Sequence, residues 1–586
     1  MDLLVIDRKE FAFKILKRNY SLKNLRIAES SCSNPCQEEI IILSESLKIN
    51  STLESLDLTK NQIEDQGIKF LCESLKKNSF LKKLNLSLND FKNKGIKHLC
   101  QLLSLNGSLE SINLSQNRLG NNEIKKISES LKLNTKLKKL NLSMNAFDQQ
   151  GVGYLVEALI INNTIENINF MMNRIGDESI EKICEILKRK NTIKKLNLHG
   201  TMLSVKSIFF LHDSLKHNTS LKSLNLSANE FDKEGTILLC EMLKTTKTLK
   251  KMYLSEIFFE DEEVISICDS IQSNCSLNFI SLKENDFEEE NIQFLIDSFM
   301  VNRSLKVIDL SENYFEEDQI KKIFEILHKN SLIEKFLFNG HKIESDIDFI
   351  CQFLKTNNSL KCLDLSGNYF NKKKLKILFR ALLSNKTIKT LDLSMSFKTK
   401  NIIYICEFLL DENCCLKKFI LEQSNLGDVE MEFLSDSLKS NTSLTCLDIK
   451  MNKKISENGF YHLSQALHFN FTLIKIVFET FCEIDEKIFF FLNCNLVWSP
   501  SNHSSFFFEF QSVVFHILLC LRVTQKTLFF KIPKFVLHEI IKKIEKRSFY
   551  QIWKKNIEKN EKEIDLMIEN NLKENNKKRK RDSKEK

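Results

Sequence analysis

The stretch Leu81-Lys-Lys-Leu-Asn-Leu-Ser-Leu-Asn89 contains the pattern that decides the fold. Its spacing, Leu-x-x-Leu-x-Leu-x-x-Asn, recurs along almost the whole chain. The step between repeats is 28 residues, except for one step of 27 and one of 29. The leading apolar residue of each repeat occupies position 53, 81, 109, 137, 165, 193, 221, 249, 277, 305, 333, 360, 388, 416, 444 or 473. A fixed period of this length predicts a solenoid, in which similar coils stack on one another.

The repeat from Leu53 to Phe80 shows how one coil is built. Leu56 and Leu58 alternate with polar residues, which predicts a short strand with one face turned inward. The apolar residues that follow have the spacing of one helix face, at Ile68, Leu71, Cys72 and Leu75. The sequence therefore predicts an α/β solenoid with stacked parallel strands. Because helices are wider than strands, we expect the strands on the concave side and the helices on the convex side.

Two asparagines mark the ends of these elements. Asn61 follows the strand, and its side-chain amide is expected to satisfy backbone groups of the turn and the next coil. Asn78 follows the helix, and we expect it to adopt the left-handed conformation of many helix caps. Other residues replace the first asparagine in six repeats, at Thr201, Ile257, His341, Ser396, Ser424 and Phe481.

The quoted phrase, followed by Gly95 and Leu99, resembles the ribonuclease-inhibitor-like leucine-rich repeats. These repeats also occur in NOD-like receptor proteins and in Ran GTPase-activating proteins. The resemblance covers about residues 21–482 and implies a horseshoe that binds other macromolecules. It indicates the fold far more strongly than the function, because one fold can carry many functions.

The repeat boundaries divide the chain into four regions. We expect an N-terminal cap at 1–20, an array of 16–17 repeats at 21–482, a small, mainly helical and hydrophobic C-terminal cap or adaptor box at 483–550, and a charged, partly disordered tail at 551–586.

Composition narrows the class of protein. The net charge of +9 is small for 586 residues, so the whole chain is not expected to bind nucleic acid. The 17 cysteines are odd in number, and many follow the repeat length, which indicates buried reduced side chains and no metal site. The most apolar stretch, Val513 to Leu521, is far shorter than the about 20 residues that span a membrane. We expect an intracellular protein, cytoplasmic and also nuclear if its tail directs import.

The strand residues that face away from the core should form ladders across the concave surface. In the central ladder most residues are Asn or Asp, a run that needs no specific function. Apolar side chains interrupt the strands of four consecutive coils, and exposed apolar surface tends to mark a binding site. These apolar residues would also be explained by sequence drift without a function, or by a neighbouring loop that covers them. We predict a protein-binding site made of Tyr253, Phe279, Val307 and Leu337, edged by Lys251, Lys283 and Lys335.

The C-terminal region supports two alternatives. Ile532-Pro533, followed by Leu537, Ile540 and Ile544, resembles the opening of F-box helices. The order of Leu518-Leu-Cys-Leu-Arg522 and then Ile532-Pro533 is similar to that of SOCS boxes, and both features lie within 498–545. Either resemblance implies recruitment of a ubiquitin ligase; the alternative is a cap that seals the last coil. The tail contains five consecutive basic residues, Lys577, Lys578, Arg579, Lys580 and Arg581. Such a run indicates nuclear import through an importin or a contact with nucleic acid, and the alternative is a merely solvated tail.

The sequence contains no phosphate-binding loop, nucleophile elbow or zinc-protease motif. We therefore predict a non-catalytic scaffold without cofactor or small-molecule substrate, which binds a protein on its concave face. The adaptor resemblance implies a substrate adaptor of a ubiquitin ligase. The alternative is a small-GTPase regulator resembling the Ran activators, although 16–17 coils and a basic tail depart from that family.

Overall fold

The computed structural model describes residues 4–6, 23–27, 37–89, 91–190, 192–341, 343, 347–478 and 488. The proposed adaptor box at 498–545, the tail at 551–586 and most of the N-terminal cap lie outside these residues.

The described residues contain eighteen strands in one sheet. Their bounds are β1 Leu4–Ile6, β2 Asn24–Ile27, β3 Ser55–Asp57, β4 Lys83–Asn85, β5 Ser111–Asn113, β6 Lys139–Asn141, β7 Asn167–Asn169, β8 Lys195–Asn197, β9 Ser223–Asn225, β10 Lys251–Tyr253, β11 Phe279–Ser281, β12 Val307–Asp309, β13 Lys335–Leu337, β14 Cys362–Asp364, β15 Thr390–Asp392, β16 Lys418–Ile420, β17 Cys446–Asp448 and β18 Lys475–Val477.

A helix follows almost every strand. The helices are α2 Gln37–Ile49, α3 Asp65–Leu75, α4 Asn93–Leu105, α5 Asn121–Leu133, α6 Gln149–Ile161, α7 Gly176–Arg189, α8 Val205–Leu215, α9 Lys233–Thr245, α10 Asp261–Ser273, α11 Ile292–Val301, α12 Glu317–Lys329, α13 Asp348–Thr356, α14 Lys372–Ser384, α15 Ile402–Leu410, α16 Asp428–Ser440 and α17 Glu457–Leu467. Short 3-10 helices precede two of them, η1 Glu289–Asn291 and η2 Thr399–Asn401.

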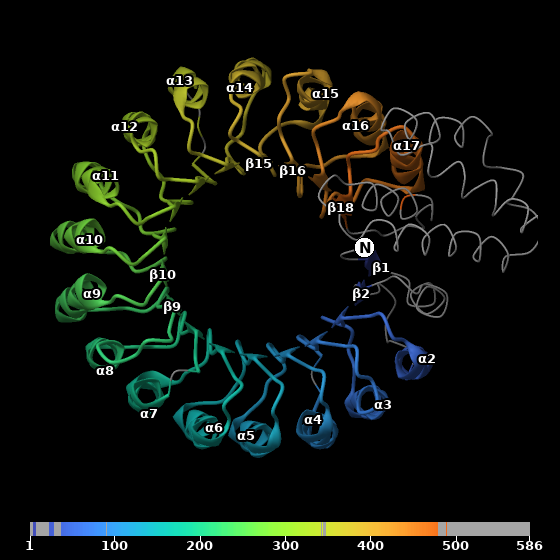
Figure 1. Ribbon diagram of the computed structural model, residues 1–586, viewed down its shortest axis with the longest axis vertical. Helices are drawn as coiled ribbons and strands as arrows, with labels where there is room; N and C mark the ends of the chain where they lie inside the picture. Colours follow the sequence, from blue (N-terminus) through green and yellow to red (C-terminus); the bar gives the residue numbers. More distant parts are fainter. Residues whose placement is uncertain are drawn as a thin grey trace, which may run out of the picture. The chain divides into compact units, whose positions relative to one another are not determined.

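Each strand pairs in parallel with the strand of the next coil, and the register keeps equivalent residues side by side. For example, Met252 of β10 lies opposite Leu224 of β9 and Ile280 of β11. The strands line the inner side of the curved array and the helices lie outside them (Figure 1). The fold prediction is confirmed: the structure is a solenoid of alternating parallel strands and helices. β1, which lacks the repeat phrase, is an additional strand that the repeat did not predict.

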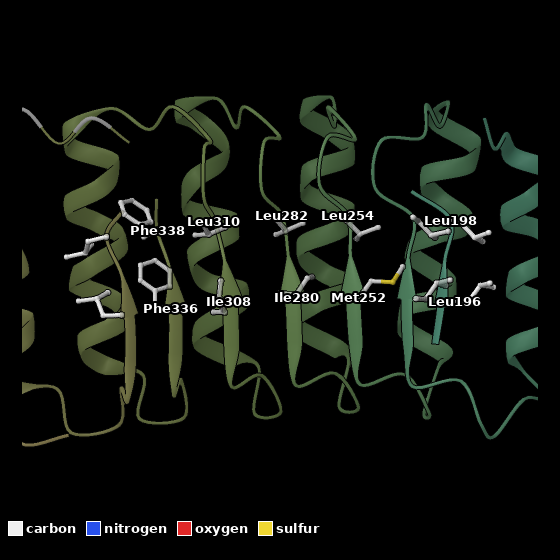
Figure 2. Close-up of a cluster of buried hydrophobic side chains, with 14 of the residues drawn as sticks. Leu196, Leu198, Met252, Leu254, Ile280, Leu282, Ile308, Leu310, Phe336 and Phe338 are labelled. Carbon is white, nitrogen blue, oxygen red and sulfur yellow. The ribbon is translucent and has the colours of Figure 1, made fainter. Parts of the chain in front are cut away.

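The core lies between the strands and the helices. The second residue of each strand from β3 to β18 is buried, and so is the residue after the strand, as in Met252 and Leu254. These pairs form two rows that continue from coil to coil (Figure 2). The first and third strand residues are not needed in the core, so they are left to form the concave surface.

The strand-end asparagine satisfies backbone groups of its own turn as expected, but the other coil that it binds is the preceding one and not the next. Nδ2 of Asn89 donates a hydrogen bond to the backbone carbonyl of Leu58 in the preceding coil (2.9 Å). Its Oδ1 accepts hydrogen bonds from the backbone N–H groups of Asn61 and Ile63 (3.1 Å each). Buried backbone groups need such partners, so the amide closes the turn between strand and helix.

The expected left-handed conformation of the second asparagine is wrong. Asn106, which caps α4, has φ −75° and ψ 126°, an extended conformation. Its Nδ2 donates to the carbonyl of Leu75 in the preceding coil, and its Oδ1 accepts from the N–H groups of Ser108 and Leu109. The helix therefore ends because the side chain binds the next segment of backbone. Left-handed residues occur instead in the loops after the strands, for example Gln62 and Arg118.

Candidate functional site

The concave ladder is uniform from β4 to β9, where asparagine is the third residue of every strand. In Asn141, Oδ1 accepts a hydrogen bond from the backbone N–H of Ser143 (3.0 Å). The same bond joins Asn197 to His199 (3.1 Å). These amides therefore hold the turn after the strand, which favours the structural explanation of the asparagine run.

The ladder changes at β10, where an aromatic pair replaces polar side chains. The rings of Tyr253 and Phe279 lie with their centroids 4.7 Å apart on adjacent strands. Both side chains are half-buried. Burial and, to a lesser extent, the negative charge of Asp309 raise the pKa of the Tyr253 hydroxyl. The pair is a rigid apolar feature with one polar group, a combination that is common at protein interfaces.

The other two apolar residues of the predicted site lie in two different ladders. Val307 is opposite Phe279 in the register, so it continues the first-residue ladder. Leu337 is opposite Asp309, so it belongs to the third-residue ladder with Tyr253. Both are half-buried. The structure therefore brings Tyr253, Phe279 and Val307 onto neighbouring positions and places Leu337 diagonally beyond them.

The three predicted lysines differ in their surroundings. Lys251 is exposed, and its Nζ lies 5.5 Å from the centroid of the Phe279 ring, a cation–π distance. Nζ of Lys283 pairs with Glu284 (2.7 Å) and Glu312 (3.0 Å). Burial lowers the pKa of Lys283, but these two carboxylates outweigh it and the net pKa is raised.

Lys335 lies between Val307 and Cys362 in the register and is half-buried. Lys251 and Lys335 thus lie beside the apolar residues in the first-residue ladder. Lys283 follows β11, where it belongs to an ion-pair cluster.

A row of carboxylates follows the aromatic pair along the concave ladder, and the sequence prediction did not select it. Asp364 and Asp392 are opposite each other on β14 and β15. Burial and the charge of Asp364 raise the pKa of Asp392 to about 6. Burial also raises the pKa of Asp448. The available signal in the sequence was Asp at the strand position where β4 to β9 have Asn.

The buried cysteines are not candidate nucleophiles. Burial raises the pKa of Cys72 well above its usual value, and that of Cys100 to about 11. A thiol that keeps its proton is a poor nucleophile and a poor metal ligand. The described cysteines are free, which agrees with their expected role as small core residues.

His341 replaces the strand-end asparagine after β13 and is buried. Its Nε2 lies 3.0 Å from the carbonyl oxygen of Leu310, so the ring donates the hydrogen bond that asparagine makes elsewhere. The ring stacks on Phe338 with a centroid distance of 3.8 Å. Burial lowers the pKa of His341 to about 3, which makes it a neutral structural residue.

Comparison with known proteins agrees with this architecture. A family model described as Leucine Rich repeat matches residues 50–72, 77–100, 133–156, 162–184 and 217–240. The fold is a leucine-rich-repeat solenoid. No curated protein matches the chain. Among solved structures, "Leiomodin-1 Actin-Binding Site 2 (ABS2)" is similar at 15% identity, over 25% of this chain and 86% of that chain, with a TM-score of 0.23. A similarity this low carries no argument about a partner.

In the described part of the chain, every helix is too short or too polar to cross a bilayer. The predicted import signal, Lys577 to Arg581, and the adaptor segment lie outside the described residues.

Proposed function

We propose that this leucine-rich-repeat solenoid is a non-catalytic scaffold that binds a protein partner on its concave face. The binding site includes Tyr253, Phe279, Val307 and Leu337, with Lys251 and Lys335 beside them.

The aromatic pair is the observation that supports this proposal. The six preceding coils show that asparagine suffices at the third strand position. Tyr253 and Phe279 make a ring contact instead, and neither belongs to the buried core. Aromatic side chains supply large contact areas at low cost in conformational entropy, so they are typical anchors for a protein partner.

The test compares two double variants of the full chain in affinity purification. Tyr253→Ala with Phe279→Ala removes the aromatic pair. Asn141→Ala with Asn167→Ala is the matched control, because these residues hold the same two ladder positions on β6 and β7. We expect the aromatic variant to lose about tenfold or more of a captured protein while the control retains it. Equal capture by the aromatic variant, or equal loss by the control, would contradict the proposal.

The proteins that are captured also decide between the finer functions. The F-box-like and SOCS-like features of 498–545 favour a substrate adaptor, for which a cullin or an adaptor of cullin ligases should be recovered. A small GTPase would favour the regulator, and a GTP-hydrolysis assay would then measure activation. For the import signal, residues 570–586 fused to a fluorescent reporter should enter the nucleus, and alanines at Lys577 to Arg581 should prevent entry.

A further inference from the structure

The loops that follow β10 and β12 each carry an exposed aromatic side chain beside the concave site. The Phe258 side chain is 66% exposed and that of Tyr314 is 67% exposed. They hold equivalent positions two coils apart, and Asp286 holds this position in the coil between them. From the spacing of strands, the two rings belong to coils about 10 Å apart. Large exposed rings at a repeated position form an unpartnered apolar edge.

Charge indicates what covers this edge. Residues 254–263, 282–291 and 310–319 contain many acidic residues and one basic residue, Lys283. We name these three segments the acidic rim. Its acidic residues are Glu256, Glu260, Asp261, Glu262, Glu263, Glu284, Asp286, Glu288, Glu289, Glu290, Glu312, Glu316, Glu317 and Asp318.

Few positive charges within the described chain neutralise the acidic rim. Lys283 pairs with Glu284 and Glu312, and Lys233 from the preceding coil pairs with Glu262. Elsewhere, carboxylates from adjacent coils crowd together: oxygens of Asp261, Glu288 and Glu290 all lie within 4.8 Å of one another. Like charges at this distance repel, so a cationic partner would gain from each of them.

Two of the corresponding loops in later coils have the opposite charge. Residues 365–374 and 393–402 contain no acidic residue and five lysines, Lys372, Lys373, Lys374, Lys398 and Lys400. The coil architecture therefore does not require acidic residues at this edge. Their concentration beside exposed rings is local to three coils, the same coils that carry Tyr253, Phe279 and Val307.

We propose that the acidic rim, together with Phe258 and Tyr314, binds a lysine- and arginine-rich segment of the protein partner, a proposal that rests on the concave-face function. Carboxylates form charge-assisted hydrogen bonds with Lys and Arg, and exposed rings add cation–π contacts. Lys251 above Phe279 shows such a contact on the neighbouring concave surface. An extended basic segment spans about 10 Å in three residues, which matches the separation of the two ring-bearing coils.

The test measures binding of a fluorescent peptide of alternating lysine and arginine to the full chain, with EDTA present to remove divalent cations. The rim variant carries Glu289→Gln, Glu290→Gln, Glu317→Gln and Asp318→Asn, four exposed residues. The control carries Glu73→Gln, Glu157→Gln, Glu407→Gln and Glu432→Gln, which are exposed on the outer helices and change the net charge equally. We expect the rim variant to bind about tenfold more weakly, with a shallower salt dependence, and the control to bind like the wild type.

A second variant, Phe258→Asn with Tyr314→Asn, tests the rings without changing the charge. Both residues have positive φ, at +58° and +50°, which asparagine tolerates, and Asn425 has φ +57° in a later loop. The variant should therefore fold, and it should bind the peptide several-fold more weakly.

Binding by the rim variant within twofold of the wild type, or an equal loss in the control, would overturn the acidic-rim proposal. The concave-face function would survive this result if the Tyr253→Ala and Phe279→Ala variant still lost its protein partner. Tighter peptide binding after Lys577 to Arg581 are changed to alanine would show that the chain's own basic run competes for the acidic rim, which supports the proposal.

Discussion

Strands β4 to β9 and strands β10 to β17 share one backbone arrangement but differ in the residue that ends the strand. The first group has asparagine in every coil. The second group has Tyr253, Ser281, Asp309, Leu337, Asp364, Asp392, Ile420 and Asp448. The register and the buried rows continue unchanged between the two groups. The concave surface can therefore change without changing the fold, and the second group is where the chain has done so.

The amide and the carboxylate perform the same backbone task at this position. Oδ1 of Asn141 accepts a hydrogen bond from Ser143 N–H at 3.0 Å, and Oδ1 of Asp392 accepts one from Ser394 N–H at 2.9 Å. Unlike the asparagine, Asp392 carries a carboxylate that is largely buried and lies opposite a second carboxylate, that of Asp364. The coil therefore does not need the carboxylates of the second group, which is consistent with a role on the proposed binding surface.

The largest expected effect tests whether the two groups share an equivalent core. Leu224 on β9 and Ile308 on β12 are both fully buried at the same coil position. Each substitution to alanine should lower the free energy of unfolding by about 2–5 kcal/mol through lost burial and a cavity. Urea unfolding of both variants measures this. A much smaller loss of stability for Ile308→Ala would mean that the second group is less tightly packed. The two groups would then differ in their cores as well as in their concave surfaces.

The next largest effect is a loss of stability at acid pH in the second group, because His341 follows β13 at the position where most coils of the first group have asparagine. The pKa of His341 is about 3 in the folded chain, against about 6.5 when unfolded. Between these values the unfolded chain binds the extra proton, so stability falls as the pH decreases from 6.5 towards 3, by about 1.4 kcal/mol per pH unit.

His341→Asn removes this titration while its amide can still donate to Leu310, as Nδ2 of Asn313 donates to Leu282 in the preceding coil. Urea midpoints of the variant and the wild type should be measured at neutral pH and near pH 5. The wild type should lose more stability than the variant as the pH falls, so the two midpoints should converge or change order. A constant difference between the two proteins across this range would show that His341 does not titrate as expected.

Asp392→Asn should have the opposite pH dependence and a somewhat smaller effect. The pKa of Asp392 is raised to about 6, above the unfolded value of about 3.9, so its contribution to stability is lost as the pH rises between these values. The variant should be about 1–3 kcal/mol more stable than the wild type at pH 7, with little difference near pH 4. A less stable variant at pH 7 would mean that the carboxylate makes a favourable contact that asparagine cannot replace.

The repeating parts of the molecule could be predicted from the sequence because each prediction rested on a local pattern. Leu56 and Leu58 indicated a strand, and the period indicated that all such strands stack. The role of Asn61 and its equivalents followed from the chemistry of an amide at a turn. The conformation of Asn78 and its equivalents did not follow, because a bond to the preceding coil, as from Asn78 Nδ2 to the Leu47 carbonyl, decides where the chain turns.

The proposed binding surface was harder to predict from the sequence. Tyr253 and Phe279 could be selected because they depart from the ladder, but their ring contact depends on the register of two strands. The acidic rim left a clear signal in the runs Glu260 to Glu263, Glu288 to Glu290 and Glu316 to Asp318, which recur at the repeat spacing. These runs lie in the loops after the strands and at the starts of the helices, so the pattern of strand residues does not contain them. The neutral state of His341 could not be predicted either, because it depends on the burial of the ring against Phe338, which no local sequence pattern shows.

The smallest expected effect on stability concerns a left-handed loop position whose side chain differs from coil to coil. Gln62 and Arg118 occupy it in early coils, whereas Phe258 and Tyr314 occupy it at the acidic rim. A bulky residue at positive φ costs more than asparagine does, and the exposed Phe258 ring recovers little by burial. Phe258→Asn should therefore leave the free energy of unfolding unchanged or raise it by up to about 1 kcal/mol, although it removes a large apolar side chain. Urea unfolding measures this against Gln62→Asn, which should change stability by less because glutamine is smaller and polar. If Phe258→Asn were destabilising by more than about 1 kcal/mol, the ring would be supporting the loop, and weaker peptide binding by that variant could no longer be assigned to lost contact with the partner.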